Sequence, residues 1–155
     1  MDIQRRDTLK AGGGLGVFGL LVAAGMVKPG VALAARDQAV FSAGSLEEAY
    51  NAMGAGSPEE SGDVQIVAPD IAENGAVVPV GVTSSLDKVE QIAILVEKNP
   101  NMVAASFTLP EGTLADVNTR IKMGQTSDVY AVVKADGKFY MAKKEVKVTL
   151  GGCGG

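Results

Sequence analysis

The side chain best suited to covalent chemistry is the thiol of Cys153, the only cysteine in this chain of 155 residues. Glycine loses more conformational freedom on ordering than any other residue, so the segment around the thiol is expected to resist packing and form a flexible arm. Cys153 follows Leu150 by three residues, a span of about 10 Å when extended. The thiol is therefore expected to enter a pocket on another protein, through a channel that only bare backbone can thread. Every other residue of the arm is glycine: Gly151, Gly152, Gly154 and Gly155.

Composition excludes most other chemistry. The chain has no histidine, so it lacks a Ser-His-Asp triad, and one cysteine cannot supply the ligands of a zinc site. Only two residues follow Cys153, whereas a prenylation box needs three. The acidic pairs at 47–48 and 59–60 are interpreted as surface charge. Nothing near Cys153 in sequence is expected to lower the thiol pKa from its usual value of about 8.5, so the chain is predicted to be no enzyme by itself and to hold no metal or cofactor.

Residues 1–34 have the order of an export signal: charged, apolar, cleavable. The twin arginines Arg5 and Arg6 precede an uncharged, glycine-rich run at 11–27, and a small-x-small site ends at Ala34. The flanking residues at 4 and 8 depart from the usual twin-arginine motif. The run is at the short limit for crossing a bilayer, which disfavours a membrane anchor. We expect export by the twin-arginine pathway and cleavage before Ala35, so the mature protein lies in the periplasm without an anchor.

Charge limits the partners. The signal carries four basic and two acidic residues, so its removal takes the formal charge from −4 to −6. Nucleic acid and acidic membranes are therefore excluded as predicted partners. Five lysines stand within twenty residues of Cys153, and they are interpreted either as a basic surface for an anion on the thiol or as guards of a strand edge: Lys134, Lys138, Lys143, Lys144 and Lys147.

Three interpretations of the thiol stay open. In an oxidising compartment a lone cysteine must be protected, modified or paired with another chain. The favoured interpretation is a covalent carrier that holds a substrate on Cys153 and presents it to successive enzymes. In the second, Cys153 forms an intermolecular disulfide in a structural β-sandwich protein. In the third, the body is a binding or adhesion module with an idle tail.

The mature body, residues 35–150, is predicted to be mainly all-β. A capping box at Ser45 and Glu48 predicts one short helix over 45–53, followed by a loop at 54–62. Beyond it, period-two alternation and turn residues predict an antiparallel β-sandwich of immunoglobulin-like type, although periodicity alone leaves a barrel open. Pro79 is expected at a sheet edge or bulge. A turn at 73–75 is expected to use positive φ, and residues 135–137 are expected to form a hairpin turn. The predicted strands are 64–68, 77–82, 90–96, 103–109, 117–123, 129–133, 139–141 and 146–150. In the strand at 103–109, Val103, Ala105, Phe107 and Leu109 are expected to share the inward face.

Several stretches resemble the SoxY family, carrier proteins of thiosulfate oxidation. The twin-arginine signal is one, and the terminal GGCGG after a valine-rich strand is the most specific. The others are the segments 71–75, 78–80, 120–127 and 144–149.

This resemblance implies an immunoglobulin-like sandwich that forms a heterodimer with SoxZ and carries thiosulfate-derived sulfur species covalently on Cys153. It further implies three transient partners. A c-type haem enzyme, SoxAX, would conjugate thiosulfate to the thiol, and a manganese hydrolase, SoxB, would release sulfate. A sulfur dehydrogenase, SoxCD, would oxidise the bound sulfane sulfur where it is present. None of their cofactors belongs to this chain.

Overall fold

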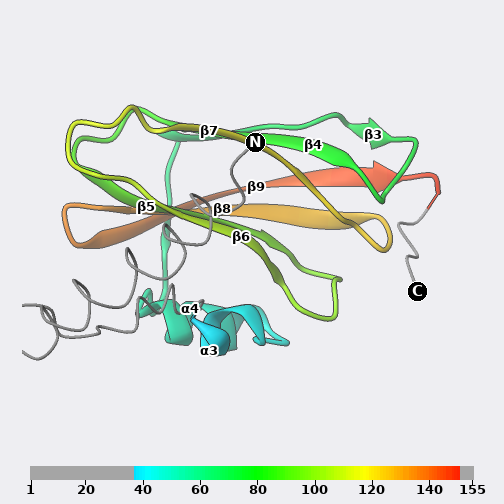
Figure 1. Ribbon diagram of the computed structural model, residues 1–155, viewed down its shortest axis with the longest axis horizontal. Coiled ribbons are helices and arrows are strands. Elements are labelled where there is room, and N and C mark those ends of the chain that lie inside the picture. The colour runs from blue at the N-terminus through cyan, green and yellow to red at the C-terminus, as the bar shows by residue number, and fades with distance from the viewer. Residues whose placement is uncertain (1–36, 151–155) are drawn as a thin grey trace, which may run out of the picture. The chain divides into compact units, whose positions relative to one another are not determined.

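The computed structural model describes residues 37–150. The chain divides into two units, residues 1–36 and 37–155, and the described residues all belong to the second unit. Its elements, shown in Figure 1, are the helices α3 (Gln38–Phe41) and α4 (Leu46–Met53) and the strands β1 (Glu59–Glu60), β2 (Val64–Val67), β3 (Ile71–Ala72), β4 (Val78–Ser84), β5 (Val89–Val96), β6 (Val103–Thr108), β7 (Asp116–Ile121), β8 (Ser127–Ala135) and β9 (Lys138–Val148).

Two sheets form the body. The larger has the strand order β1-β9-β8-β5-β6, with β3 also paired to β9, and the smaller has the order β2-β4-β7. Figure 1 shows the smaller sheet on one side of the larger one and the two helices on the other. All pairings are antiparallel except those of the short strands β1 and β3 with β9. The predicted all-β, immunoglobulin-like antiparallel sandwich with a short N-terminal helix is confirmed.

The core has two layers because the larger sheet is covered on both faces. Ile92 and Ile94 of β5 belong to the cluster between the sheets, whereas Ala93 and Leu95 belong to the cluster beneath the helices. A strand buried on both faces has a continuous apolar run rather than an alternating one. This explains why β5 and β8 are nearly unbroken in apolar residues.

The helices are set by local sequence. Ser45 caps α4 by accepting a hydrogen bond from the Glu48 amide at 3.1 Å, and the Glu48 carboxylate accepts one from the Gly44 amide at 2.9 Å. Gly54 ends the helix with a left-handed φ of 70°. The predicted helix is confirmed. The sequence did not predict α3, a single turn whose first amides are capped by the Asp37 side chain.

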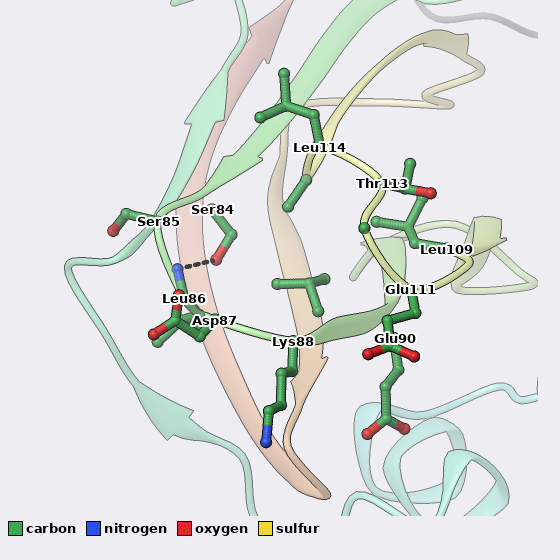
Figure 2. Close-up of a pocket in the computed structure, with 13 residues that line it drawn as sticks. Ser84, Ser85, Leu86, Asp87, Lys88, Glu90, Leu109, Glu111, Thr113 and Leu114 are labelled. Carbon is green, nitrogen blue, oxygen red and sulfur yellow. Dashed lines mark hydrogen bonds between the residues drawn. The ribbon is translucent and has the colours of Figure 1, made fainter.

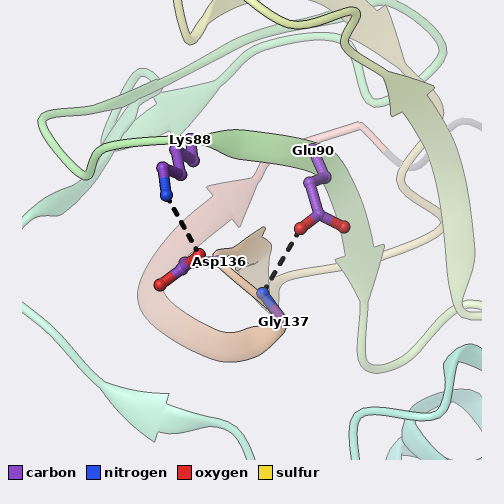
Figure 3. Close-up of polar contacts among 4 residues, drawn as sticks. All are labelled: Lys88, Glu90, Asp136 and Gly137. Atoms are coloured by element: carbon purple, nitrogen blue, oxygen red, sulfur yellow. Dashed lines mark hydrogen bonds and ion pairs between the residues drawn. The ribbon is translucent and has the colours of Figure 1, made fainter.

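The hairpin between β8 and β9 confirms the turn expected at 135–137. Asp136 and Gly137 both have positive φ, 48° and 76°, as a two-residue type I′ loop requires. Figure 3 shows how the start of β5 braces this turn: Lys88 Nζ lies 3.6 Å from an Asp136 carboxylate oxygen, and Glu90 accepts a hydrogen bond from the Gly137 amide at 3.3 Å. Lys88 itself has a φ of 53°, which is unusual for a residue with a side chain.

The expectation that Pro79 marks an edge strand was wrong for the strand as a whole. β4 is the central strand of the smaller sheet, between β2 and β7. The pairing with β2 extends only from Gly81 to Ser84, so Pro79 has a strand partner, Arg120, on one side alone. A proline needs only a locally unpaired side, which the short β2 provides.

Two other expectations need correction. The turn at 73–75 is present, but neither Asn74 nor Gly75 has positive φ, because the Asn74 side chain organises the turn by accepting a hydrogen bond from the Ala76 amide at 2.9 Å. In β6, Val103 faces the helices while Phe107 packs in the sandwich, since a register shift in its pairing with β5 reverses the alternation.

Candidate functional site

The predicted site residues lie outside the described residues. These are Cys153 and the arm glycines Gly151, Gly152, Gly154 and Gly155, the twin arginines Arg5 and Arg6, and the cleavage residues Ala34 and Ala35. The structure does describe the segment from which the arm starts. We call residues 146–150 the arm root.

One side of the arm root is hydrogen bonded to residues 70–75. The Lys147 amide donates to the Asp70 carbonyl at 3.0 Å, and the Thr149 amide donates to the Ala72 carbonyl at 3.1 Å. The Leu150 carbonyl accepts a hydrogen bond from the Gly75 amide at 2.8 Å. These bonds continue the parallel pairing of β3 with β9 past the end of the strand. The last residue before the arm is therefore bonded to the body through its own backbone.

The other side of the arm root meets the loop between β7 and β8. The Thr126 hydroxyl accepts a hydrogen bond from the Val148 amide at 2.9 Å. The Met123 amide donates to the Gly75 carbonyl at 2.7 Å, which joins this loop to the segment on the opposite side. Val146 and Met123 are both fully buried. The arm root is thus held by two segments that are distant in sequence, and its buried side chain fixes its position.

These contacts unite the stretches that carry the resemblance to the SoxY family. The segments 71–75, 120–127 and 144–149 are separated by many residues in the chain, yet all three meet at the arm root. Periodicity marked them only as parts of different strands and turns. The roles of Thr126, Asp70 and Gly75 were not predicted, because each acts through a contact with a residue far away in sequence.

The predicted cluster of five lysines is only partly correct. Lys138 lies at the hairpin end of β9, and ten residue steps at about 3.3 Å place it roughly 33 Å from Val148. Lys134 lies on β8 at the same end of the sheet, and its ammonium group is 3.0 Å from a Glu90 carboxylate oxygen. Because β9 is one long strand rather than two, the lysines are spread along its length.

Near the arm, Lys144 serves the fold. Its ammonium group lies 3.0 Å from an Asp70 carboxylate oxygen and donates to the Ala68 carbonyl at 2.6 Å. It therefore connects β9 to the segment that borders the arm root. Lys143 and Lys147 are exposed, and neither has an ion-pair partner within 4 Å among residues 37–150. These two remain available to an anion near the arm.

A cleft lies at the end of the sandwich away from the arm root. It has a volume of about 860 Å³ and lies between the loops at 84–88 and 109–115, as Figure 2 shows. Val89 pairs with Ala135 beside the β8–β9 hairpin, so the cleft is at the end of β9 opposite the arm root. Its polar groups include a Ser84 hydroxyl that accepts from the Leu86 amide at 3.2 Å. Within the described ranges, no group of three or more potential metal ligands comes together.

Two tyrosines have shifted pKa values, and both belong to the helix-covered face. Burial raises the pKa of Tyr50, with smaller contributions from Tyr130 and the Glu97 carboxylate. Burial likewise raises the pKa of Tyr130, followed by the carboxylates of Glu97 and Asp128. The Tyr50 hydroxyl lies 3.7 Å from the Met141 sulfur, so it is part of the packing. Both phenols stay protonated at neutral pH and offer no base to a reaction.

Comparison with known proteins identifies the family. The family described as sulfur oxidation protein SoxY matches residues 49–153, about two thirds of the chain. The chain belongs to the SoxY family. A solved structure of the sulfur carrier protein SoxY from Chlorobium limicola f thiosulfatophilum is 42% identical, with a TM-score of 0.61. That similarity covers 70% of this chain and 95% of the other. SoxY proteins are sulfur carriers rather than catalysts, and the family works with partners of the sulfur-oxidation system.

Other comparisons add little. A chain from a structure of T cell activation by the bacterial superantigen toxic shock syndrome toxin-1 has 9% identity and a TM-score of 0.40, over 55% of this chain and 98% of the other. It supports no inference about function. A search of curated proteins found no match. Between residues 37 and 150, no helix has the length and hydropathy needed to cross a bilayer.

Proposed function

We propose that this SoxY-family protein carries sulfur intermediates as covalent adducts of Cys153. The observation that carries the proposal is that the family match covers residues 49–153, which include both the sandwich and Cys153. Support also comes from the arm root, since the backbone of Leu150 is bonded to the body directly before the glycines begin. A fixed root with a side-chain-free extension lets the body stay outside an enzyme while the thiol goes in.

The chemistry is a cycle on one sulfur atom. In the first step, the Cys153 thiol and thiosulfate form an S–S bond, which gives a cysteine S-thiosulfonate, releases one proton and passes two electrons to the haem-containing conjugating enzyme. In the second step, water cleaves the terminal S–S bond, which leaves a cysteine persulfide and releases sulfate and a proton. Where a sulfur dehydrogenase is present, it oxidises the persulfide sulfur to a cysteine S-sulfonate, with oxygens from three water molecules, release of seven protons and transfer of six electrons to the dehydrogenase. Hydrolysis of the S-sulfonate then releases sulfate and a proton and restores the thiol. The chain itself supplies only the attachment point.

The proposal includes the partner proteins and the cellular location. SoxZ is the proposed stable partner, SoxAX the conjugating enzyme, SoxB the hydrolase and SoxCD the dehydrogenase. The export signal with Arg5 and Arg6 supports a periplasmic location reached through the twin-arginine pathway. Cleavage between Ala34 and Ala35 would release the carrier from its signal.

Intact-mass analysis tests the proposal. The mature protein is incubated with thiosulfate and the purified conjugating enzyme of the same system, and a thiosulfonate adduct is expected on the parent but not on Cys153→Ser. Addition of the hydrolase is expected to convert the adduct to a persulfide. Recovery of unmodified thiol after every treatment would overturn the carrier function.

The second candidate function is an intermolecular disulfide through Cys153 in a structural protein. The lone cysteine in an exported chain favours it. Non-reducing electrophoresis together with the activity of Cys153→Ser separates the two. A carrier loses activity in this variant whether or not the parent also forms a disulfide dimer.

A further inference from the structure

The arm root emerges beside an unusual group of exposed aliphatic side chains. Among residues 37–150, five large hydrophobic side chains are exposed. Two of them lie in the segments that are hydrogen bonded to one another at the arm root, Ile71 (58% exposed) and Leu150 (66%), and a third, Val77 (52%), follows Gly75 by two residues. We call these three residues the root patch.

We infer that the root patch is the surface against which the enzymes that act on Cys153 dock, through an apolar rim around the entrance of their active sites. This inference rests on the proposed carrier function. The other two exposed hydrophobic residues, Val67 and Leu114, lie outside the segments that contact the arm root.

The length of the arm indicates which proteins cover the root patch. Cys153 is three residues beyond Leu150, so its alpha carbon can stand no more than about 10 Å from that of Leu150. An enzyme that encloses the thiol must therefore bring the rim of its active site onto the surface around Leu150. Residues 71–77 border that point, because the Gly75 amide bonds to the Leu150 carbonyl and the Ala72 carbonyl to the Thr149 amide. An enzyme that takes the thiol into a buried site therefore covers surface next to Leu150, and residues 71–77 form one side of that surface.

The apolar character of the root patch suits a surface to which several different enzymes bind in turn. Burial of aliphatic side chains is non-directional, so the same patch can pack against several rims without matched hydrogen bonds. Docking on the root patch also positions the start of the arm relative to the enzyme. The backbone of Leu150 is hydrogen bonded to the segment that carries Ile71 and Val77. An enzyme that contacts the root patch is therefore positioned relative to the point where the arm leaves the body. Recognition of the body thereby directs the arm.

The test compares substitutions on the patch with one at the far end of the sandwich. Ile71→Glu, Ile71→Lys and Val77→Glu place charges on the patch, and Leu114→Glu is the control because Leu114 is 78% exposed and borders the distant cleft. Val77 lies outside the strands, so its variant leaves strand pairing untouched. For each protein two rates are measured: adduct formation on Cys153 by the purified conjugating enzyme with thiosulfate, and reaction of the thiol with dithiodipyridine. Melting temperature and gel filtration with the partner subunit are recorded for each.

Each patch variant is expected to lower the kcat/KM of the enzyme for the carrier about tenfold, while the rate with dithiodipyridine, the melting temperature and the control stay unchanged. Equal enzymatic rates for the patch variants and the parent would overturn the inference. So would an effect of Ile71→Glu without one of Ile71→Lys, which would indicate a charge contact instead. Loss of partner-subunit binding or of self-association in the patch variants would assign the surface to a stable interface and also overturn it. If the parent acquires no adduct, the proposed carrier function fails instead.

Discussion

The hydrogen bond between the Val148 amide and the Thr126 hydroxyl allows a quantitative test of how firmly the arm root is held. Thr126→Val keeps the shape of the side chain and removes the acceptor, which lies 2.9 Å from the amide in a part-buried position. An amide left without a partner in such a place costs about 1 to 3 kcal/mol. We expect the lower part of that range, about 1 to 2 kcal/mol, because the site is only part-buried.

Two measurements check this expectation. For a body of this size, each kcal/mol corresponds to a shift in melting temperature of about 3 to 6 °C. Thr126→Val should therefore melt several degrees below the parent. Native-state hydrogen exchange should show the Val148 amide losing protection by more than amides in the middle of β9, since the loss is local to the root.

Thr149→Val is the matched control, because it makes the same chemical change one residue beyond Val148. The Thr149 hydroxyl donates to the Glu73 carbonyl at 3.1 Å in an exposed position, where water can replace it. Its cost should stay within about 0.5 kcal/mol. If Thr126→Val destabilises no more than Thr149→Val and leaves Val148 protected, the loop between β7 and β8 does not hold the arm root as described.

Three other variants probe the backbone, the titration and the arm. Lys88→Gly should raise the free energy of unfolding by about 0.5 to 1 kcal/mol, because glycine adopts a φ of 53° without strain and only an exposed ion pair is lost. Lys138→Gly, the control, should lower the free energy of unfolding. Urea unfolding measures both variants, and a lower stability for Lys88→Gly would show that the backbone at Lys88 is not strained. The folded state holds the phenolic protons of Tyr50 and Tyr130 more tightly than the unfolded chain, because both pKa values are raised on folding. The free energy of unfolding should therefore keep its full value below about pH 10 and decrease as pH rises through the raised pKa values. Unfolding measured at several alkaline pH values should show a smaller decrease for Tyr130→Phe than for the parent. Gly152→Leu should slow enzymatic turnover of the carrier about tenfold or more with no change in melting temperature, and rates equal to those of the parent would refute the idea that the arm threads a narrow channel.

Local sequence was enough wherever neighbouring residues make the decisive contacts. The cap at Ser45 and Glu48 and the turn at Asp136 and Gly137 involve groups within four residues, so their patterns predicted the outcome. Alternation predicted the sandwich because one face of most strands is buried. Alternation failed for β8 because that strand is buried on both faces. It failed for β9 because that strand packs with the helix-covered cluster near its start and pairs with β3 near its end, which hid the true length of the strand.

Pro79 shows the limit of a rule that depends on a neighbour. The sequence shows that Pro79 cannot donate a hydrogen bond, but only the structure shows that the pairing of β4 with β2 stops at Gly81 and leaves that side of Pro79 free. The lysines of β9 show the same limit. Their spacing in sequence suggested one basic cluster, and a single extended strand distributes them along about 30 Å.

The sequence by itself determined the chemistry: one thiol, no histidine, and glycines around it, because reactivity and backbone freedom belong to individual residues. It also carried the resemblance that the family match confirmed. Only the tertiary structure decided how the arm is mounted. Asp70, Gly75 and Thr126 hold the root through contacts with residues at least 22 positions away in sequence, and the segment that carries Ile71 and Val77 comes beside Leu150 only when β3 pairs with β9.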